Sequence, residues 1–138
     1  MNILYDERLD GPVPQLDRTA IRDSLAQAIP GMTLLDREED MRPFECDGLS
    51  VYRTLPMLVA MPDSLDQVQR LLQECHRLGV PVVTRGAGTG LSAGALPLEH
   101  GVLLVMSRFS RILEVDPEAR IARVEPGVRN LAISEAAS

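Results

Sequence analysis

Lysine is missing from this chain of 138 residues. The 14 residues of the Lys and Arg type are all arginines, and they form no run along the sequence. Acidic residues number 20, so the formal net charge is -6. Nucleic acids attract proteins through basic patches that neutralise phosphates. The charge distribution therefore argues against a nucleic-acid partner.

Residues that bind metals or form disulfides are also scarce. The chain has two cysteines, Cys46 and Cys75, which form no C-x-x-C pair, and two isolated histidines, His76 and His100. A metal site needs several such ligands at suitable spacing, and the sequence contains no group of ligands with that spacing. We interpret the cysteines as buried thiols in a reducing compartment, with a disulfide as the alternative.

Long apolar runs are absent as well. No stretch approaches the ~20 residues of a membrane-spanning helix, and the first residues, MNILYDERLDG, lack the layout of a secretory signal. These features favour a cytoplasmic chain. Hydrophobic residues make up 45% and charged residues 25% of the sequence, which is typical of a soluble domain with a packed core.

Residues 1–50 are predicted to form an N-terminal arm and a helix. Prolines and a glycine interrupt regular structure near the start of the chain. Apolar residues at helical spacing then predict one helix, capped by Asp17 or Thr19 and ended by Pro30-Gly31. Residues 32–50 are expected to be a loop-rich connection with one short strand.

A strand–helix–strand unit is the clearest pattern in the sequence. Leu55–Pro62 is a short apolar run that predicts a buried strand. The helix after it is predicted to start at a capping box of Ser64 and Gln67 and to end at Gly79. Val80–Thr84 predicts the second strand. Short links on both sides of the helix favour a βαβ unit with parallel strands.

Three further strands are expected after this unit, at 101–106, 111–116 and 120–126. Asp116-Pro117 is a turn signal, so the last two strands are predicted to form a hairpin. A final helix is expected with Asn130 as its cap. The predicted fold class is α+β (α/β), with a βαβ unit plus further strands.

The stretch Thr84–Leu96, TRGAGTGLSAGAL, follows the second strand of the unit. It contains a G-x-S-x-G pattern centred on Ser92 and a G-x-G-x-x-A pattern that starts at Gly88. The first is typical of hydrolase nucleophiles and the second of dinucleotide binding, but both require a helix directly afterwards. Gly94 and Pro97 argue against such a helix, and therefore against both interpretations.

A free-standing anion cradle explains the stretch better. Glycines alternate with other residues from 86 to 90, so the main chain can approach an anion closely. Thr89 and Ser92 add hydroxyl groups and Arg85 adds positive charge. Ligands of open α/β sheets bind at the carboxyl ends of the strands, where this stretch begins. We predict a diphosphate ligand; a mobile link between strands is the alternative.

Three segments also resemble a known family. PVVTRGAGTGLSAGALP resembles the FAD pyrophosphate loop of the vanillyl-alcohol oxidase/p-cresol methylhydroxylase (PCMH) type of flavoprotein, and LVAMPDSLDQVQRLLQECHRLGVPV is similar to the strand–helix–strand before it. VLLVMSRFSRILEVDPEARIARVEPGVRNLAISEAA is similar to the branch that holds the FAD-linked subunit of bacterial glycolate oxidase and D-lactate dehydrogenases. The resemblance implies that residues 51–138 are the truncated first part, and first subdomain, of a PCMH-type FAD-binding domain.

The resemblance further implies which residues contact the cofactor. The glycine loop would wrap the FAD diphosphate, a proline would lie near the adenine end, and a Pro-Gly-Val segment would line the cofactor. No residue matches a flavin attachment motif, so FAD is expected to be non-covalent, and no catalytic or metal-binding residue is expected in this chain. The expected cofactor-binding residues are Pro62, Arg85, Gly86, Ala87, Gly88, Thr89, Gly90, Leu91, Ser92, Pro126, Gly127 and Val128.

The activity that the resemblance implies is flavin-dependent oxidation of a small 2-hydroxy acid, glycolate or D-lactate. Members of the family continue past this point, so the chain is expected to be an inactive fragment. Because a cut through a domain exposes apolar sheet, the fragment is also expected to self-associate. Expected partners are other glycolate oxidase subunits, including an iron-sulfur subunit, and expected locations are the cytoplasm and the inner face of the cell membrane. The alternatives are a non-catalytic nucleotide- or partner-binding α/β module and an aldonolactone or alcohol oxidase relative.

Overall fold

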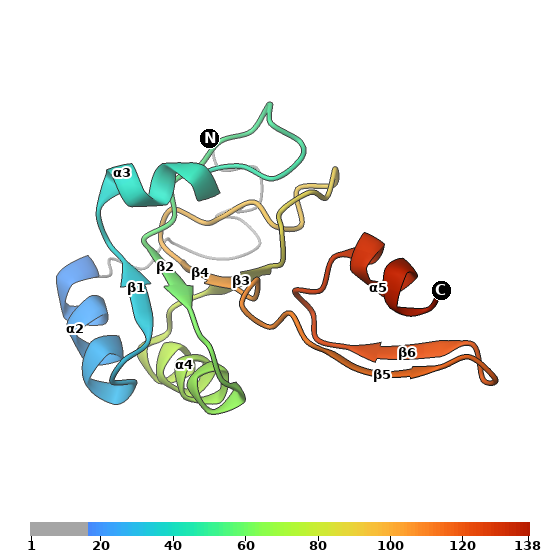
Figure 1. The fold of residues 1–138 in the computed structure, drawn as a ribbon. Coiled ribbons are helices and arrows are strands. Elements are labelled where there is room, and N and C mark those ends of the chain that lie inside the picture. Colours follow the sequence, from blue (N-terminus) through green and yellow to red (C-terminus); the bar gives the residue numbers. More distant parts are fainter. Residues whose placement is uncertain (1–16) are drawn as a thin grey trace.

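The computed structural model describes residues 17–138 (Figure 1). The predicted N-terminal arm lies outside the described residues. In chain order the elements are α2 (Arg18–Ala28), β1 (Thr33–Leu35), α3 (Glu38–Met41), η1 (Arg42–Phe44), β2 (Leu58–Met61), α4 (Leu65–Leu78), β3 (Val82–Arg85), β4 (Val102–Val105), β5 (Ile112–Asp116), β6 (Ile121–Val124) and α5 (Asn130–Ala136).

Four strands form the main sheet in the order β1-β2-β4-β3. β2, β4 and β3 run parallel, and β1 pairs with β2 in the antiparallel direction. The prediction that β2 and β3 are parallel is correct, but the two strands are not neighbours. The strand β4, which follows β3 in the chain, lies between them, because the connection through α4 passes over the width of one strand.

The helix α4 follows its sequence pattern closely. Ser64 Oγ accepts a hydrogen bond from Gln67 N at 3.4 Å, and Asp63 N donates to Gln67 Oε1 at 2.9 Å. At the other end Gly79 adopts the left-handed conformation with φ of +67°. Both ends are thus satisfied locally, as the capping box and the glycine predicted.

The helix α2 is also capped as predicted. Asp17 Oδ1 accepts hydrogen bonds from Thr19 N at 2.9 Å and Ala20 N at 3.3 Å. Asp17 is therefore the capping residue and Thr19 lies inside the first turn. At the C-terminal helix α5 the prediction is wrong by one residue, because Arg129 is the cap position and Asn130 is the first helical residue.

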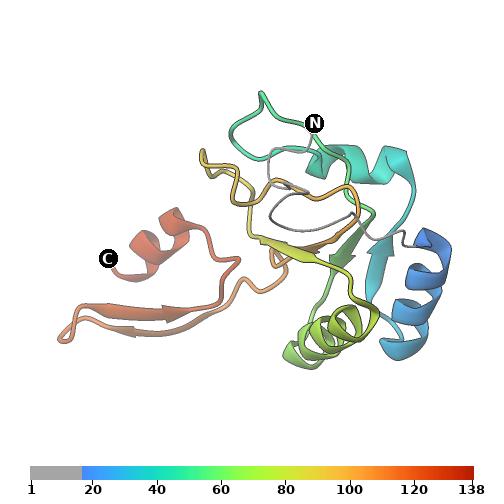
Figure 2. The ribbon, with the colours of Figure 1, turned by 180° about the vertical axis from the view of Figure 1, so that it is seen from behind.

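Both faces of the main sheet are covered. α2 and α4 pack on one face, and the short α3–η1 segment packs on the other (Figures 1 and 2). The segment 32–50 contains the expected short strand, but α3 and η1 were not predicted. These turns depend on burial of Met41, which the local sequence does not reveal. The core residues on the α2–α4 face are Ile21, Leu25, Ile29, Met32, Met57, Leu58, Ala60, Leu71, Cys75, Val80, Val102 and Leu104.

Elements from before and after residue 50 share this sheet and core. β1 pairs with β2, and α2 packs beside α4. The predicted division into residues 1–50 and 51–138 therefore runs through one packed unit. As a statement about domains it stays a prediction.

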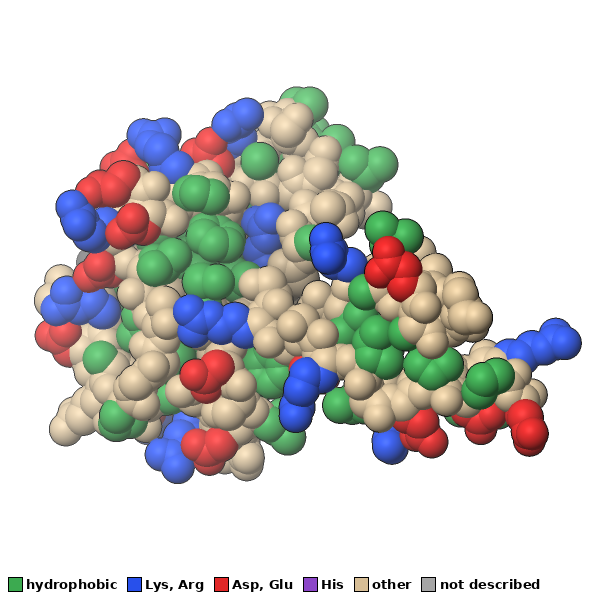
Figure 3. All heavy atoms as spheres, viewed as in Figure 1, with side chains coloured by type: hydrophobic (Ala, Val, Ile, Leu, Met, Phe, Trp, Pro, Cys, Tyr) green, Lys and Arg blue, Asp and Glu red, His purple; other side chains and the backbone are tan. Residues whose placement is uncertain are grey.

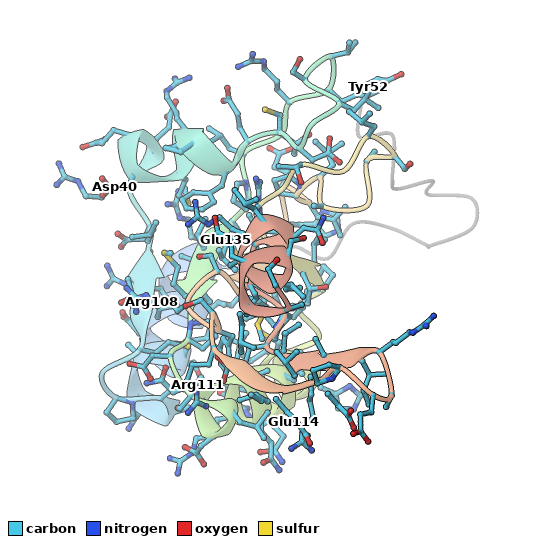
Figure 4. All side chains as sticks on the ribbon, turned by 45° about the vertical axis from the view of Figure 1, so that its right-hand side comes forward. Asp40, Tyr52, Arg108, Arg111, Glu114 and Glu135 are labelled. Atoms are coloured by element: carbon cyan, nitrogen blue, oxygen red, sulfur yellow. The ribbon has the colours of Figure 1, made fainter. Side chains whose placement is uncertain are left out.

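The β5–β6 hairpin and α5 form a lobe that projects from the main sheet (Figure 1). The two strands pair in the antiparallel direction, as expected. Arg111 Nη2 lies 2.7 Å from Glu125 Oε1, and Arg123 Nη2 lies 3.1 Å from Glu114 Oε2 (Figure 4 labels Arg111 and Glu114). Hydrophobic side chains gather on the visible face of this lobe (Figure 3).

A polar network joins α2 to α4 on the surface. Ser24 Oγ donates to Glu74 Oε1 at 2.6 Å, and Arg77 Nε donates to Glu74 Oε2 at 2.8 Å. Hydrogen bonds from Arg77 and then Ser24 lower the pKa of Glu74 from 4.5 to about 2. The ionised carboxylate is thus favoured in the folded state.

We expect Glu74→Gln to lower the free energy of unfolding at neutral pH. A lowered pKa stabilises the folded state above the unfolded-state pKa, and this contribution disappears as pH falls from 4.5 to about 2. The difference between wild type and Glu74→Gln should therefore shrink over that range in denaturant titrations. Glu39→Gln, at an exposed carboxylate, controls for the loss of one negative charge; a gap that stayed constant with pH would contradict the assignment.

Candidate functional site

The glycine loop, residues 86–92, begins at the carboxyl end of β3. Arg85 O accepts a hydrogen bond from Met106 N at 2.8 Å, just past the end of β4, so the chain leaves the sheet at this point. No helix forms between the loop and β4. The hydrolase and dinucleotide-fingerprint interpretations both require such a helix, and the structure therefore agrees with their rejection.

The main-chain amides of the glycine loop, from Gly86 to Ser92, have no partner among the main-chain carbonyls of residues 17–138. Gly88 has a φ of +71°, a conformation that favours glycine. A Cβ atom added at Gly90 would meet no atom within 4 Å. Among the described residues the loop thus combines unpaired donors with open space, which is what a main-chain anion cradle requires.

The Arg85 side chain clamps the start of the glycine loop. Its exposed fraction is 8%. Nη1 donates to Cys46 O at 2.9 Å and to Phe44 O at 3.2 Å, and Nη2 donates to Ala87 O at 3.3 Å. The guanidinium carbon also lies 5.7 Å from the centre of the Phe44 ring. The guanidinium therefore holds main chain on both sides of it, a role that sequence reasoning missed.

Burial determines the electrostatics of Arg85. Desolvation lowers the pKa of its guanidinium, while the nearby Cys46 and Asp47 act in the opposite direction. A Cβ atom added at Gly88 would overlap the guanidinium, so the bare glycine makes room for the clamp. The positive charge predicted at Arg85 thus lies beside the anion cradle. The N–H groups of its guanidinium donate to main-chain carbonyl oxygens.

The Pro-Gly-Val segment lies next to the start of the loop. A Cβ atom added at Gly86 would lie 3.6 Å from Pro126 O. Gly127 N donates to Phe109 O at 2.7 Å, and Val128 N donates to Glu125 O at 3.1 Å. The structure therefore brings together two sets of predicted site residues that are far apart in the sequence.

Pro62 lies on the same edge of the sheet, but farther away. It is buried and directly follows β2, which is separated from β3 by β4. Because the three strands are parallel, their carboxyl ends share one edge. Arg108, which Figure 4 labels beside β1, donates to Met61 O at 3.1 Å and Thr33 Oγ1 at 3.0 Å near this point.

The described residues contain no group of three or more metal-ligating side chains. Cys46 and Cys75 are both free, and Cys75 is buried, which together with nearby Glu74 raises its pKa to about 11. Of the helices between residues 17 and 138, none has the length and apolar character to cross a membrane. The glycine loop and its neighbours are therefore the main candidate site.

A glycine loop at the carboxyl edge of a parallel sheet is a common arrangement for a main-chain anion site. The FAD binding domain family matches residues 56–138. The chain belongs to this family. The cofactor of the family is FAD, and the bare amides and open space of the glycine loop fit its diphosphate.

Curated relatives are similar over most of this chain but are much longer. The glycolate oxidase subunit GlcD of Escherichia coli (strain K12) is 61% identical over 136 residues, which are 99% of this chain and 27% of the relative. The glycolate oxidase subunit GlcD of Bacillus subtilis (strain 168) is 32% identical over 80% of this chain and 24% of the relative. The chain thus spans about a quarter of the length of these relatives.

Solved structures show the same fold. p-Cresol methylhydroxylase has a TM-score of 0.73 at 22% identity, over 90% of this chain and 25% of that protein. 4-Ethylphenol oxidase from Gulosibacter chungangensis has a TM-score of 0.73 at 24% identity, over 86% of this chain and 24% of that protein. The predicted fold, a mixed α/β part of a PCMH-type FAD-binding domain, is confirmed.

Proposed function

We propose that this chain supplies the diphosphate-binding part of the FAD site in a flavin-dependent 2-hydroxy-acid oxidoreductase. The observation that carries the proposal is the set of amides from Gly86 to Ser92, at the carboxyl edge of the sheet, that donate to no main-chain carbonyl of residues 17–138. Hydrogen bonds to a charged group contribute about 1.5–3 kcal/mol each, so several such amides can hold a diphosphate. Thr89 and Ser92 are exposed and can add hydroxyl donors.

The residues of this chain bind and orient the cofactor and perform no chemistry themselves. When bound, FAD supplies the electron acceptor for oxidation of the substrate C–H bond. Non-covalent attachment is part of the proposal. Pro126, Gly127 and Val128 lie beside the loop and would line the cofactor next to its diphosphate, and Pro62 would lie toward the adenine. The groups that act on substrate are proposed to lie outside this chain.

Glycolate or D-lactate is the proposed substrate. The support is the 61% identity to a glycolate oxidase subunit and the 36% identity, over 58% of this chain, to the D-lactate dehydrogenase of Archaeoglobus fulgidus. Because the first of these relatives is named as a subunit, we propose partner subunits, with an iron-sulfur protein among them. A cytoplasmic location, at the inner membrane face through these partners, completes the proposal.

FAD binding tests the proposal directly. The full-length protein that contains this chain is stripped of flavin and titrated with FAD while flavin fluorescence is followed. We expect stoichiometric binding, glycolate-dependent flavin reduction, and weak or no binding by residues 1–138 alone. A full-length protein that binds a nucleotide but no flavin would instead support the non-catalytic binding module.

Gly90→Ala should weaken FAD binding about 10- to 100-fold, the cost of one or two charge-assisted hydrogen bonds. The added methyl group enters open space in the free protein, so the unfolding temperature without FAD should stay unchanged. Gly94→Ala is the matched control, because it also adds a methyl group to open space, beyond the proposed contacts. Equal FAD affinities for all three proteins would contradict close approach of the diphosphate at Gly90.

A further inference from the structure

A second loop packs against the main chain of the glycine loop. We call residues 45–54 the brace loop; it connects η1 to the segment before β2, and Figure 4 labels Tyr52 at its outer end. Thr54 N donates to Glu45 O at 2.8 Å and Tyr52 N donates to Leu49 O at 3.3 Å, so the brace loop is closed by its own hydrogen bonds. It precedes the residues matched by the FAD binding domain family, which start at 56.

Gly48 is the point where the brace loop contacts the glycine loop. A Cβ atom added there would lie 2.6 Å from Thr89 O, 2.8 Å from Gly90 O and 3.0 Å from Thr89 C. These neighbours are main-chain atoms, which cannot move aside as a side chain can. The main chains of the two loops therefore approach as closely as they do only because residue 48 has no side chain.

This contact determines which way two amides of the glycine loop point. The carbonyl groups of Thr89 and Gly90 face Gly48. In a trans peptide the N–H of the next residue points opposite to the carbonyl, and the described residues contain no cis peptide bond. The N–H groups of Gly90 and Leu91 therefore point away from the brace loop. A Cβ atom added at Gly90 would meet no atom within 4 Å.

The brace loop is held in place from two directions. Asp47, whose exposed fraction is 5%, accepts a hydrogen bond from Leu49 N through Oδ1 at 2.9 Å, a local turn that fixes the direction of the chain at Gly48. Its buried Oδ2 has no hydrogen-bond partner among the described residues. Arg85 donates to Phe44 O and Cys46 O directly before this turn. One guanidinium thus anchors the starts of both loops.

We propose that Gly48 is a positioning residue of the cofactor site. Its contact with the Thr89 and Gly90 carbonyls turns the amides of Gly90 and Leu91 toward the diphosphate. The turn at Asp47 holds Gly48 in position. The inference rests on the proposed FAD binding and deepens it. It places part of the cofactor site in a segment that the glycine motif does not include.

The test is Gly48→Ala in the full-length protein. We expect affinities for FAD and for ADP, which both carry the diphosphate, to fall by the same factor of about 10 to 100. The unfolding temperature without ligand should fall as well, because main-chain atoms of the glycine loop must shift to admit the added methyl group. Gly94→Ala is the control and should bind both ligands as the wild type does.

A second pair of variants keeps the test decisive if Gly48→Ala does not fold. Asp47→Ala removes the acceptor for Leu49 N and should weaken FAD binding, whereas Asp47→Asn retains that acceptor and should preserve it. Wild-type affinity in Gly48→Ala, or in Asp47→Ala, overturns the inference while the proposed function stands. A wild-type protein that binds no FAD overturns both.

Discussion

Replacing Arg85 by methionine is expected to destabilise the protein by about 3–5 kcal/mol, because three main-chain carbonyls lose a charged donor at about 1–3 kcal/mol each. The change deletes the donors that bond Phe44 O, Cys46 O and Ala87 O. It also leaves the buried Asp47 carboxylate without its nearby cation. Carbonyls that lose their charged donor, and a buried carboxylate that loses a nearby positive charge, account for the size of the effect.

Denaturant titration measures this loss, and two further variants define its origin. Adding Asp47→Asn to Arg85→Met should recover part of the stability, because the uncompensated buried charge is then absent. Arg70→Met serves as control, since the Arg70 side chain is 52% exposed and pairs with Asp66 on the surface of α4. A stability of Arg85→Met equal to that of Arg70→Met would show that the clamp contributes nothing.

Loss of FAD is expected to accompany the loss of stability in Arg85→Met. The same guanidinium anchors the glycine loop at Ala87 and the brace loop at Cys46. Without it both loops lose their relative position. Flavin content of the purified full-length protein, compared with that of Arg70→Met, measures this second effect.

Gly127→Ala is expected to cost about 1–3 kcal/mol through overpacking, together with about 1 kcal/mol for a weakened hydrogen bond. The new Cβ atom would lie 2.6 Å from Met106 O, 2.7 Å from Phe109 O and 2.9 Å from Ser107 O. These main-chain oxygens belong to the connection between the main sheet and the β5–β6 lobe. Gly127 N also donates to Phe109 O in the same place, so the junction must open.

Gly86→Ala is the matched control for stability. Its Cβ atom would lie 3.6 Å from Pro126 O, which is an ordinary contact at the same junction. Thermal unfolding of the two variants should therefore differ clearly, with Gly127→Ala the less stable. Flavin content of Gly127→Ala should fall as well, because Pro126 is displaced from the start of the glycine loop. Equal unfolding temperatures would remove the steric argument at Gly127.

Elements with strong local signals were predictable residue by residue. The caps of α4 at Ser64 and Gly79, and of α2 at Asp17, depend on hydrogen bonds between neighbours in the sequence. The β5–β6 hairpin depends on a turn within a few residues. By contrast α3 and η1 were missed, since their formation depends on burying Met41 against distant strands.

The candidate site divides in the same way. Glycine spacing and the position after a strand were enough to predict an anion cradle from Gly86 to Ser92, because unpaired amides follow from composition and local geometry. The resemblance added Pro126 to Val128 as site residues. Neither indicated that Pro126 O lies beside Gly86, or that Arg85 bonds the main chain of residues 44 and 46.

The amino-acid sequence by itself determined the ends of α4, the cap of α2, the β5–β6 hairpin and the glycine loop, because each arises from interactions over a few residues. Only the tertiary structure decided that β4 lies between β2 and β3, that Arg85 acts as a clamp, and that Gly48 contacts the carbonyls of Thr89 and Gly90. These arrangements join segments about 40 residues apart, as Gly48 and Thr89 are. Such contacts depend on how the whole chain packs, and local sequence patterns do not indicate that packing.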